Sequence, residues 1–170
     1  MAASSGKQVL FIPAEGGGGH LENTACSKGN VMNEFQWDME MNIGVAEIDE
    51  QHEYLTGVLN TLCQSFAQGT DKEILEETIS QINDYGRYHF ETEERYMRQF
   101  ENEYPDYIAH LEAHQEFFEK VVSFLLDYVE GKDSITIELL NYLVDWWFQH
   151  INGMDKGLGK FLQQKGVAEA

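Results

Sequence analysis

The stretch YHFETEERYM, residues 88–97, places His89 and Glu93 four residues apart in an amphipathic run. In an α-helix, residues at this spacing lie one above the other on one face, so a single cation can contact both side chains. Such pairs also occur by chance on solvated helix surfaces. Here Ile79 and Ile82 continue the same stripe and turn the pair toward the core. Because an unpaired buried carboxylate is costly, the stripe favours a metal or another charged partner at Glu93.

Length and charge limit the kinds of protein that this chain can be. Its 170 residues can build one hydrophobic core, and a second full domain is not expected. Thirty acidic residues against eleven basic ones give a formal net charge of -19, which argues against nucleic acid or an anionic membrane surface as a partner. No apolar run is long enough for a signal-peptide core or a membrane-spanning helix. Cys26 and Cys63 match no zinc or disulfide spacing, which favours a reducing interior, and we therefore expect a cytoplasmic protein without membrane insertion.

The chain divides into a tail and a helical domain. Residues 1–33 are rich in Gly, Ser and Ala and show no sustained helical period, so we expect a flexible N-terminal tail. His20 falls in this tail, where nothing nearby in the sequence fixes its geometry. The domain covers residues 34–170 and begins with an extended lead-in over residues 37–44.

Four stretches of the domain have the apolar periodicity of helices. Their expected limits are Gly69 for the end of the first, Thr70 with Glu73 for the capping box of the second, Pro105 and Gly131 for the third, and Asp133 or Ser134 for the cap of the fourth. A short last segment with Leu158, Phe161 and Leu162 is expected to close the bottom of the core. Four long helices joined by short turns predict an all-α fold, an antiparallel up-and-down four-helix bundle with a short C-terminal helical segment.

Each expected helix carries histidine on its apolar stripe. His52 interrupts the first stripe, and a polar group there needs a hydrogen-bond partner or a metal. His110 and His114 on the third helix repeat the spacing of four, which lets two imidazoles reach one ion.

The fourth helix adds His150 and, within the segment HINGMD, Asp155. On a continuing α-helix these two residues lie roughly 140° apart. Both can therefore serve one site only if the helix breaks, which Gly153 permits.

Four of these segments resemble the hemerythrin family, in particular its bacterial members. They are IDEQH (residues 48–52), HFETEE (89–94), HLEAH (110–114) and HINGMD (150–155), and the resemblance extends over about residues 34–162. It implies a non-heme di-iron centre with a hydroxo or oxo bridge and seven protein ligands. The implied ligands are His110, His114 and His150 on one iron, His52 and His89 on the other, and Glu93 and Asp155 as bridges.

The implied function follows from coordination counting. Five histidines, two bridging carboxylates and one bridging hydroxide leave one position of two octahedral irons open. The resemblance places this position on the two-histidine iron, where dioxygen is held as hydroperoxide. We expect reversible dioxygen binding without catalysis, in a carrier, a store or a protein that delivers oxygen to an oxygen-consuming enzyme. The alternative is a module that senses oxygen, redox state or nitric oxide and acts through a signalling partner.

Large apolar side chains flank the implied ligands. Phe90, Trp146, Trp147 and Ile151 are expected to form a dry wall of the oxygen pocket. At the position of Trp147 the family often has leucine, so the larger ring either narrows access to the site or rotates outward and lines a tunnel.

Two further acidic residues lie next to Glu93 in the sequence. Glu91 and Glu94 are expected to be exposed helix carboxylates.

Overall fold

The structure is a computed structural model that describes residues 37–68, 71–131 and 135–167. The tail predicted for residues 1–33, with His20 and Cys26, falls outside these residues, as do the caps predicted at Thr70, Asp133 and Ser134. The division into a tail and a domain therefore stays a prediction.

Four long helices and one short helix make up the described chain. They are α1 (Ala46–Gln68), α2 (Asp71–Arg98), α3 (Tyr107–Val129), α4 (Ile135–His150) and α5 (Lys156–Gln164). A 3-10 turn, η1 (Met39–Met41), precedes α1, and one π-helical turn, η2 (Ile151–Asp155), joins α4 to α5. No β-strand occurs among the described residues.

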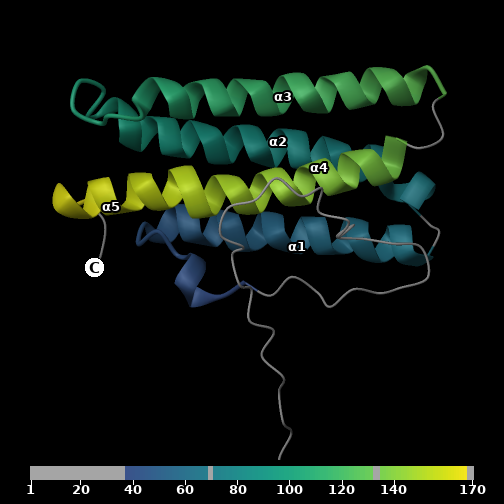
Figure 1. Cartoon of the computed structure of the whole chain (residues 1–170). Coiled ribbons are helices and arrows are strands. Elements are labelled where there is room, and N and C mark those ends of the chain that lie inside the picture. The colour runs from purple at the N-terminus through teal and green to yellow at the C-terminus, as the bar shows by residue number, and fades with distance from the viewer. Residues whose placement is uncertain (1–36, 69–70, 132–134, 168–170) are drawn as a thin grey trace, which may run out of the picture.

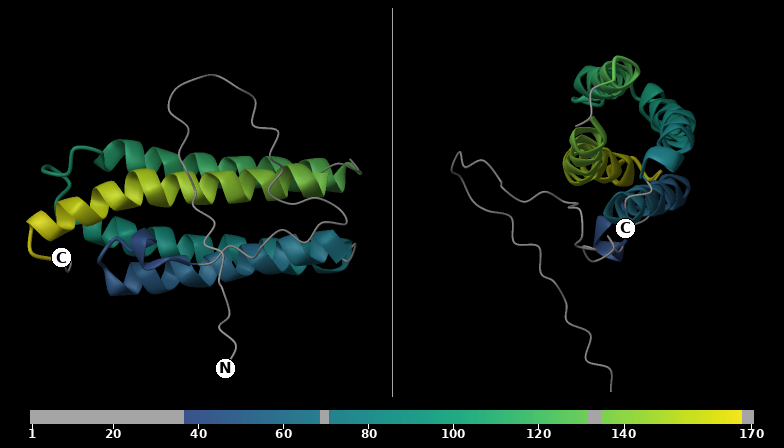
Figure 2. Two further views of the ribbon diagram at one scale, coloured as in Figure 1. Left: turned by 60° about the horizontal axis from the view of Figure 1, so that its bottom comes forward. Right: turned by 90° about the vertical axis from the view of Figure 1, so that its right-hand side faces the viewer.

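The four long helices form an up-and-down bundle (Figure 1). Helix α1 packs against α2 and α4, and α3 packs against the same two helices. Successive helices run in opposite directions, and the end-on view in Figure 2 shows them arranged around a common centre. The predicted all-α bundle with a short C-terminal helical segment is confirmed.

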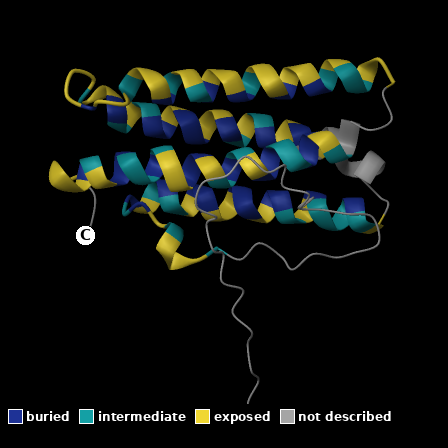
Figure 3. Ribbon diagram, viewed as in Figure 1, coloured by how far each residue is buried: buried dark blue, intermediate teal, exposed yellow. Residues whose placement is uncertain are grey.

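The apolar stripes account for this arrangement, since each helix buries one face and leaves the other in water (Figure 3). The buried residues form two clusters. The larger cluster includes Leu55, Leu62, Ile82, Phe117, Val121 and Leu140, and the smaller cluster, next to α5, contains Ile43, Val45, Ile48, Met97, Tyr104, Leu158 and Leu162. Along α1, α2 and α3, and along the run from α4 into α5, the predicted ligands lie between residues that belong to or pack against the two clusters. Apolar packing above and below therefore holds the polar side chains at one level of the bundle.

The lead-in before α1 is held in place by backbone contacts. It contains the turn η1, so the prediction of an extended lead-in is only partly right. The Asp49 carboxylate accepts hydrogen bonds from the backbone N–H groups of Ile43 (2.7 Å) and Gly44 (3.1 Å). A Cβ atom on Gly159 of α5 would lie 2.8 Å from Ile43 Cβ, so the missing side chain allows this close approach.

The structure bears on two further predictions, one about membrane-spanning helices and one about the cysteines. Among the described residues no helix combines the length and hydropathy needed to cross a membrane. Cys63 is partly buried in α1 against the larger cluster, and its sulfur is disulfide-bonded. The expectation that the cysteines form no disulfide is therefore wrong for Cys63.

Candidate metal centre

Seven buried polar side chains meet at the middle level of the bundle. They are His52 from α1, His89 and Glu93 from α2, His110 and His114 from α3, His150 from α4 and Asp155 from η2. None is more than 5% exposed. These are the seven residues predicted from the sequence, and the fold brings all of them together.

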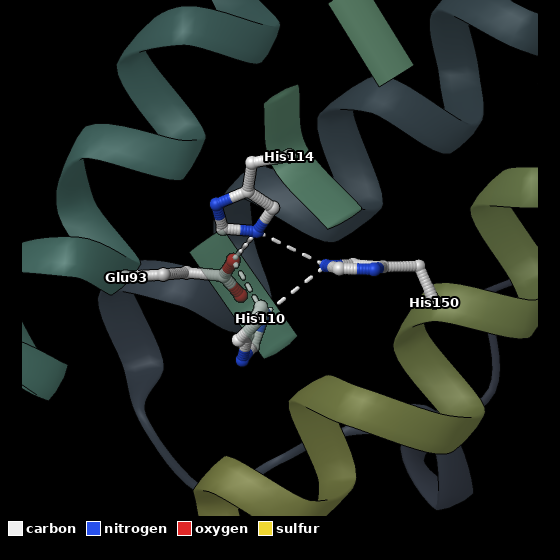
Figure 4. Close-up of side chains that lie close together, drawn as sticks. All are labelled: Glu93, His110, His114 and His150. Carbon is white, nitrogen blue, oxygen red and sulfur yellow. Dashed lines mark hydrogen bonds and ion pairs between the residues drawn. The ribbon is translucent and has the colours of Figure 1, made fainter. Parts of the chain in front are cut away.

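His110, His114 and His150 form what we call the three-histidine group. The Nε2 atom of His150 lies 3.2 Å from that of His110 and 3.1 Å from that of His114. Figure 4 shows the three imidazoles and the Glu93 carboxylate pointing toward one another. Three ring nitrogens converge on one small volume, which is the arrangement of terminal metal ligands.

His52 and His89 form the two-histidine group. Their ring centroids are 4.7 Å apart, and both Nε2 atoms face Glu93, at 3.9 Å and 3.7 Å from Oε1. This group therefore has the same orientation of Nε2 toward the centre, with one histidine fewer.

The two carboxylates connect the groups. Glu93 directs Oε1 to the two-histidine group and Oε2 to His114, at 3.1 Å. Asp155 directs Oδ1 to His150, at 3.1 Å, and Oδ2 to His52, at 3.2 Å. Each carboxylate thus has one oxygen on each side, as a ligand that bridges two ions requires.

The donor set fits metal ions better than it fits a closed hydrogen-bond network. Buried atoms without a hydrogen-bond partner include Nε2 of His52 and His89 and all carboxylate oxygens of Glu93 and Asp155. Leaving such atoms unpaired in a protein interior is costly, whereas a cation would satisfy them. The ligand atoms fall into two sets of four, and within each set all atoms lie within 4.8 Å of one another. One set comes from Glu93, His110, His114 and His150, and the other from His52, His89, Glu93 and Asp155.

The same residues are matched by a known protein family. The profile of the Hemerythrin HHE cation binding domain covers residues 43–162 of this chain. The chain belongs to the hemerythrin family. The groups of histidines and carboxylates described above fit the cation binding for which this family is named.

Individual hemerythrins show the same relationship. The chain is 35% identical over 122 residues to the bacteriohemerythrin of Stenotrophomonas maltophilia, which covers 71% of this chain and 76% of that protein. It is 28% identical over 127 residues to the bacteriohemerythrin of Clostridium acetobutylicum, covering 72% and 96% of the two chains. A hemerythrin of Sipunculus nudus is 31% identical over 121 residues, covering 71% of this chain and 87% of that protein.

In this hemerythrin Asp155 reaches the site without a break in the helix. Residues 151–155 form a π-helical turn whose flanking residues, His150 and Lys156, keep right-handed helical dihedral angles. A π-turn bonds residue i to residue i+5, so it places Asp155 on the same face as His150. The prediction that the helix must break near Gly153 is therefore wrong, because one wider turn is sufficient.

Burial and charge act differently on His89 and His110. Burial lowers the pKa of His89 from 6.5 to about 4. Burial would also lower the pKa of His110, but the negative charges of Asp155 and Glu93, whose oxygens lie 3.1 Å and 3.5 Å from its Nε2, raise it from 6.5 to about 10. Without metal, His89 is therefore neutral at pH 7, whereas His110 carries a proton that a metal ion must displace.

The carboxylates are ionised and available as ligands. Burial would raise the pKa values of Glu93 and Asp155, but the surrounding histidines hold both below their usual range.

Sequence reasoning missed three buried polar residues beside the two-histidine group, Gln51, Thr56 and Thr92. Gln51 Oε1 lies 3.0 Å from His89 Nδ1, and Gln51 Nε2 donates to Thr92 Oγ1 at 3.1 Å. The sequence could have indicated two of them. Thr56 follows His52 by four residues and Thr92 follows His89 by three, so each threonine lies on the same helix face as a predicted ligand.

Aromatic rings surround the ligands as predicted. The Phe90 ring stacks on His114 with centroids 3.9 Å apart, and Trp146 stacks on His150 at 4.3 Å. Ile151 is fully buried in the same region.

Trp147 points inward and is held there. Its ring contacts His52 and His89 edge-on, with centroids 5.4 Å and 5.5 Å away, and its side chain is 5% exposed. The indole N–H donates to Thr56 Oγ1 at 3.1 Å, and the Thr56 hydroxyl donates to the His52 carbonyl at 2.8 Å. Of the two orientations left open by the sequence, the structure has the inward one.

The two acidic neighbours of Glu93 differ from each other. Glu91 is exposed, as predicted. Glu94 is only 30% exposed, and its Oε1 lies 3.8 Å from His114 Nδ1. The prediction of an exposed carboxylate is wrong for Glu94, because this position turns back toward the imidazole of α3.

Proposed function

We propose that this hemerythrin binds dioxygen reversibly at a non-heme di-iron centre and serves as a carrier, a store or a source of oxygen for an oxygen-consuming enzyme. The placement of Glu93 and Asp155 supports this most directly, because each presents one oxygen to either group of histidines. When bound there, two irons would supply the redox chemistry that reversible dioxygen binding requires.

The residues divide into two sets of ligands. We assign His110, His114 and His150 to one ion and His52 and His89 to the other, with Glu93 and Asp155 shared. The ion with two histidines has one protein ligand fewer, so dioxygen is proposed to bind on that side.

The proposed oxygen pocket is dry because large side chains surround the ligands. Trp147 lies against His52 and His89, and Ile151 is buried nearby. Phe90 and Trp146 cover imidazoles of the three-histidine group. Excluding water from the pocket limits proton transfer to the bound gas and loss of reduced oxygen, which favours release of dioxygen unchanged.

The relatives named above are hemerythrins and bacteriohemerythrins, and they do not favour the alternative of a sensing module. Catalysis is not part of the proposal, since a histidine-rich site with one open position differs from the carboxylate-rich sites of di-iron oxidases.

The test is a cycle of reduction, oxygenation and deoxygenation. Iron-loaded protein is reduced without air, exposed to air and then stripped of oxygen while its visible spectrum is recorded. A charge-transfer band that appears with air and bleaches on deoxygenation, with two irons per chain by metal analysis, is the expected result. Zinc-loaded protein is the control and should show no band. Irreversible oxidation, or steady production of peroxide, would contradict the proposal.

A further inference from the structure

Gln51 is a buried polar residue that the proposed function does not use. It follows the first turn of α1, next to His52 in the sequence, and is 3% exposed. Its amide is directed across the bundle to α2, where it meets Thr92 through Nε2 and His89 through Oε1.

The orientation of this amide follows from counting donors and acceptors. The Thr92 hydroxyl lies 2.9 Å from the Tyr88 carbonyl, which can only accept, so the hydroxyl hydrogen is used there. Thr92 Oγ1 can then only accept from Gln51, and of the two amide atoms only Nε2 can donate. The NH2 end of Gln51 therefore faces Thr92, and Oε1 faces His89.

The same counting fixes the proton on His89. Gln51 Oε1 can only accept, so the ring nitrogen 3.0 Å away, Nδ1, must carry the hydrogen. In a neutral imidazole, Nε2 is then bare, and this is the atom that faces Glu93 and the centre. A metal ion binds the bare nitrogen of a neutral imidazole, so this tautomer is the one that can act as a ligand.

We propose that Gln51 is a positioning residue that holds His89 in its metal-binding tautomer, and that Thr92 sets the orientation of Gln51. The relay runs from the Tyr88 carbonyl through Thr92 and Gln51 to His89 and uses no charged group outside the site. By contrast, Nδ1 of His52 and of His114 has no hydrogen-bond partner among the described residues. The inference rests on His89 being a ligand, as proposed above, but not on dioxygen binding.

The readout is the tautomer of His89 in metal-free protein. Long-range proton–nitrogen NMR on histidine-labelled protein at pH 7 distinguishes a protonated Nδ1 from a protonated Nε2. The unmodified chain should show Nδ1 protonated. Thr92→Val removes the acceptor that orients the amide, so Gln51 can turn its NH2 toward His89, and the tautomer with a protonated Nε2 should appear.

Two substitutions of Gln51 separate positioning from packing. Gln51→Glu keeps an acceptor beside Nδ1, so the tautomer and the affinity for Zn²⁺ should be retained. Gln51→Leu removes the acceptor, and affinity measured by competition with a chelator should fall roughly 10- to 100-fold, the usual cost of losing such a partner. Thr61→Val is the matched control, because it deletes the hydroxyl of an exposed threonine on the same helix, where the hydroxyl bonds to the Gly57 carbonyl. Circular dichroism would establish that each variant is folded.

The outcomes are distinct. If Thr92→Val and Gln51→Leu keep a protonated Nδ1 and unchanged affinity for Zn²⁺, or if Gln51→Glu loses as much affinity as Gln51→Leu, the inference is overturned. Because the test uses metal-free and zinc-loaded protein, its result does not depend on whether the iron-loaded protein binds dioxygen. Failure of reversible oxygenation with a normal His89 tautomer would contradict only the proposed function.

Discussion

The two groups of histidines face one another across the same two carboxylates, yet different forces hold them. In the three-histidine group, aromatic rings stack on the imidazoles, Phe90 on His114 and Trp146 on His150. In the two-histidine group, hydrogen bonds dominate, with Gln51 beside His89 and Thr56 bonded to the carbonyl of His52. Stacking fixes the plane of a ring but leaves its proton free, whereas a hydrogen bond at Nδ1 also selects the tautomer. Control of the proton is thus clearest at His89, whereas Nδ1 of His52 has no hydrogen-bond partner among the described residues and Nδ1 of His110 lies 3.5 Å from the Tyr104 hydroxyl.

Removing the residue that both groups share should have the largest effect. Glu93→Ala deletes one oxygen from each side of the centre, so we expect metal content to fall from two ions per chain to one or none. Metal analysis after dialysis measures this. Glu91→Ala is the matched control, because it makes the same change of charge at an exposed position of the same helix. A Glu93→Ala protein that still holds two irons and binds dioxygen normally would show that the bridging role is wrong.

The second prediction uses the opposite pKa shifts of His110 and His89 in metal-free protein. His110 has a folded-state pKa of about 10, above 6.5, so its stabilisation is present below pH 6.5 and is lost as the pH rises toward 10. His89 has a folded-state pKa of about 4, so its stabilisation is present above pH 6.5 and is lost as the pH falls toward 4. The free energy of unfolding should therefore peak near pH 6.5 and decline by on the order of a few kcal/mol toward either end.

Urea unfolding of metal-free protein between pH 5 and 9 measures this peak. Zinc-loaded protein is the comparison. Bound metal displaces the proton of His110 and keeps the other ring nitrogens unprotonated, so the decline above pH 6.5 should disappear and the decline below pH 6.5 should become steeper. Calorimetric titrations with Zn²⁺ in buffers of different ionisation enthalpy should show proton release at pH 7. Binding without proton release would mean that His110 is neutral in the metal-free protein.

The ligand level of the bundle was predictable because each helix places a polar residue within an otherwise apolar stripe. His52 follows Ile48 by four residues and precedes Leu55 by three, so the stripe alone fixes the direction of its side chain. The same reasoning turned Glu93 inward, and its side chain is buried.

The features that the sequence did not reveal depend on contacts between helices or on departures from regular geometry. The π-turn before Asp155 changes the residue spacing itself, which a fixed helical period cannot anticipate. The contact between Gln51 and His89 depends on the register of α1 against α2, and the approach of Glu94 to His114 depends on that of α2 against α3. Neighbours along one helix carry no information about such registers.

The two adjacent tryptophans offer a smaller and more selective test of the comparison. Trp147 contacts the two-histidine group, and Trp146 covers His150 of the other group. If dioxygen enters on the two-histidine side, Trp147→Leu should speed oxygen exchange several-fold, whereas Trp146→Leu should leave it close to the original rate. Stopped-flow mixing with oxygenated and deoxygenated buffer gives both rates. Equal rates in all three proteins would remove Trp147 as the group that controls access.

The smallest effect is expected at Glu94, whose carboxylate lies near Nδ1 of His114 without a hydrogen bond to it. The distance of 3.8 Å from Glu94 Oε1 to His114 Nδ1 is too long for a strong hydrogen bond, and the carboxylate is 30% exposed. Glu94→Gln keeps the shape and removes the charge, so affinity for Zn²⁺ should fall by less than about tenfold, below the usual cost of losing a closely bonded partner. Chelator competition with Glu91→Gln as the control measures this difference. A loss as large as that of Gln51→Leu would mean that Glu94 closes onto His114 when metal is bound, and that both groups of histidines depend on hydrogen-bonded partners to a similar degree.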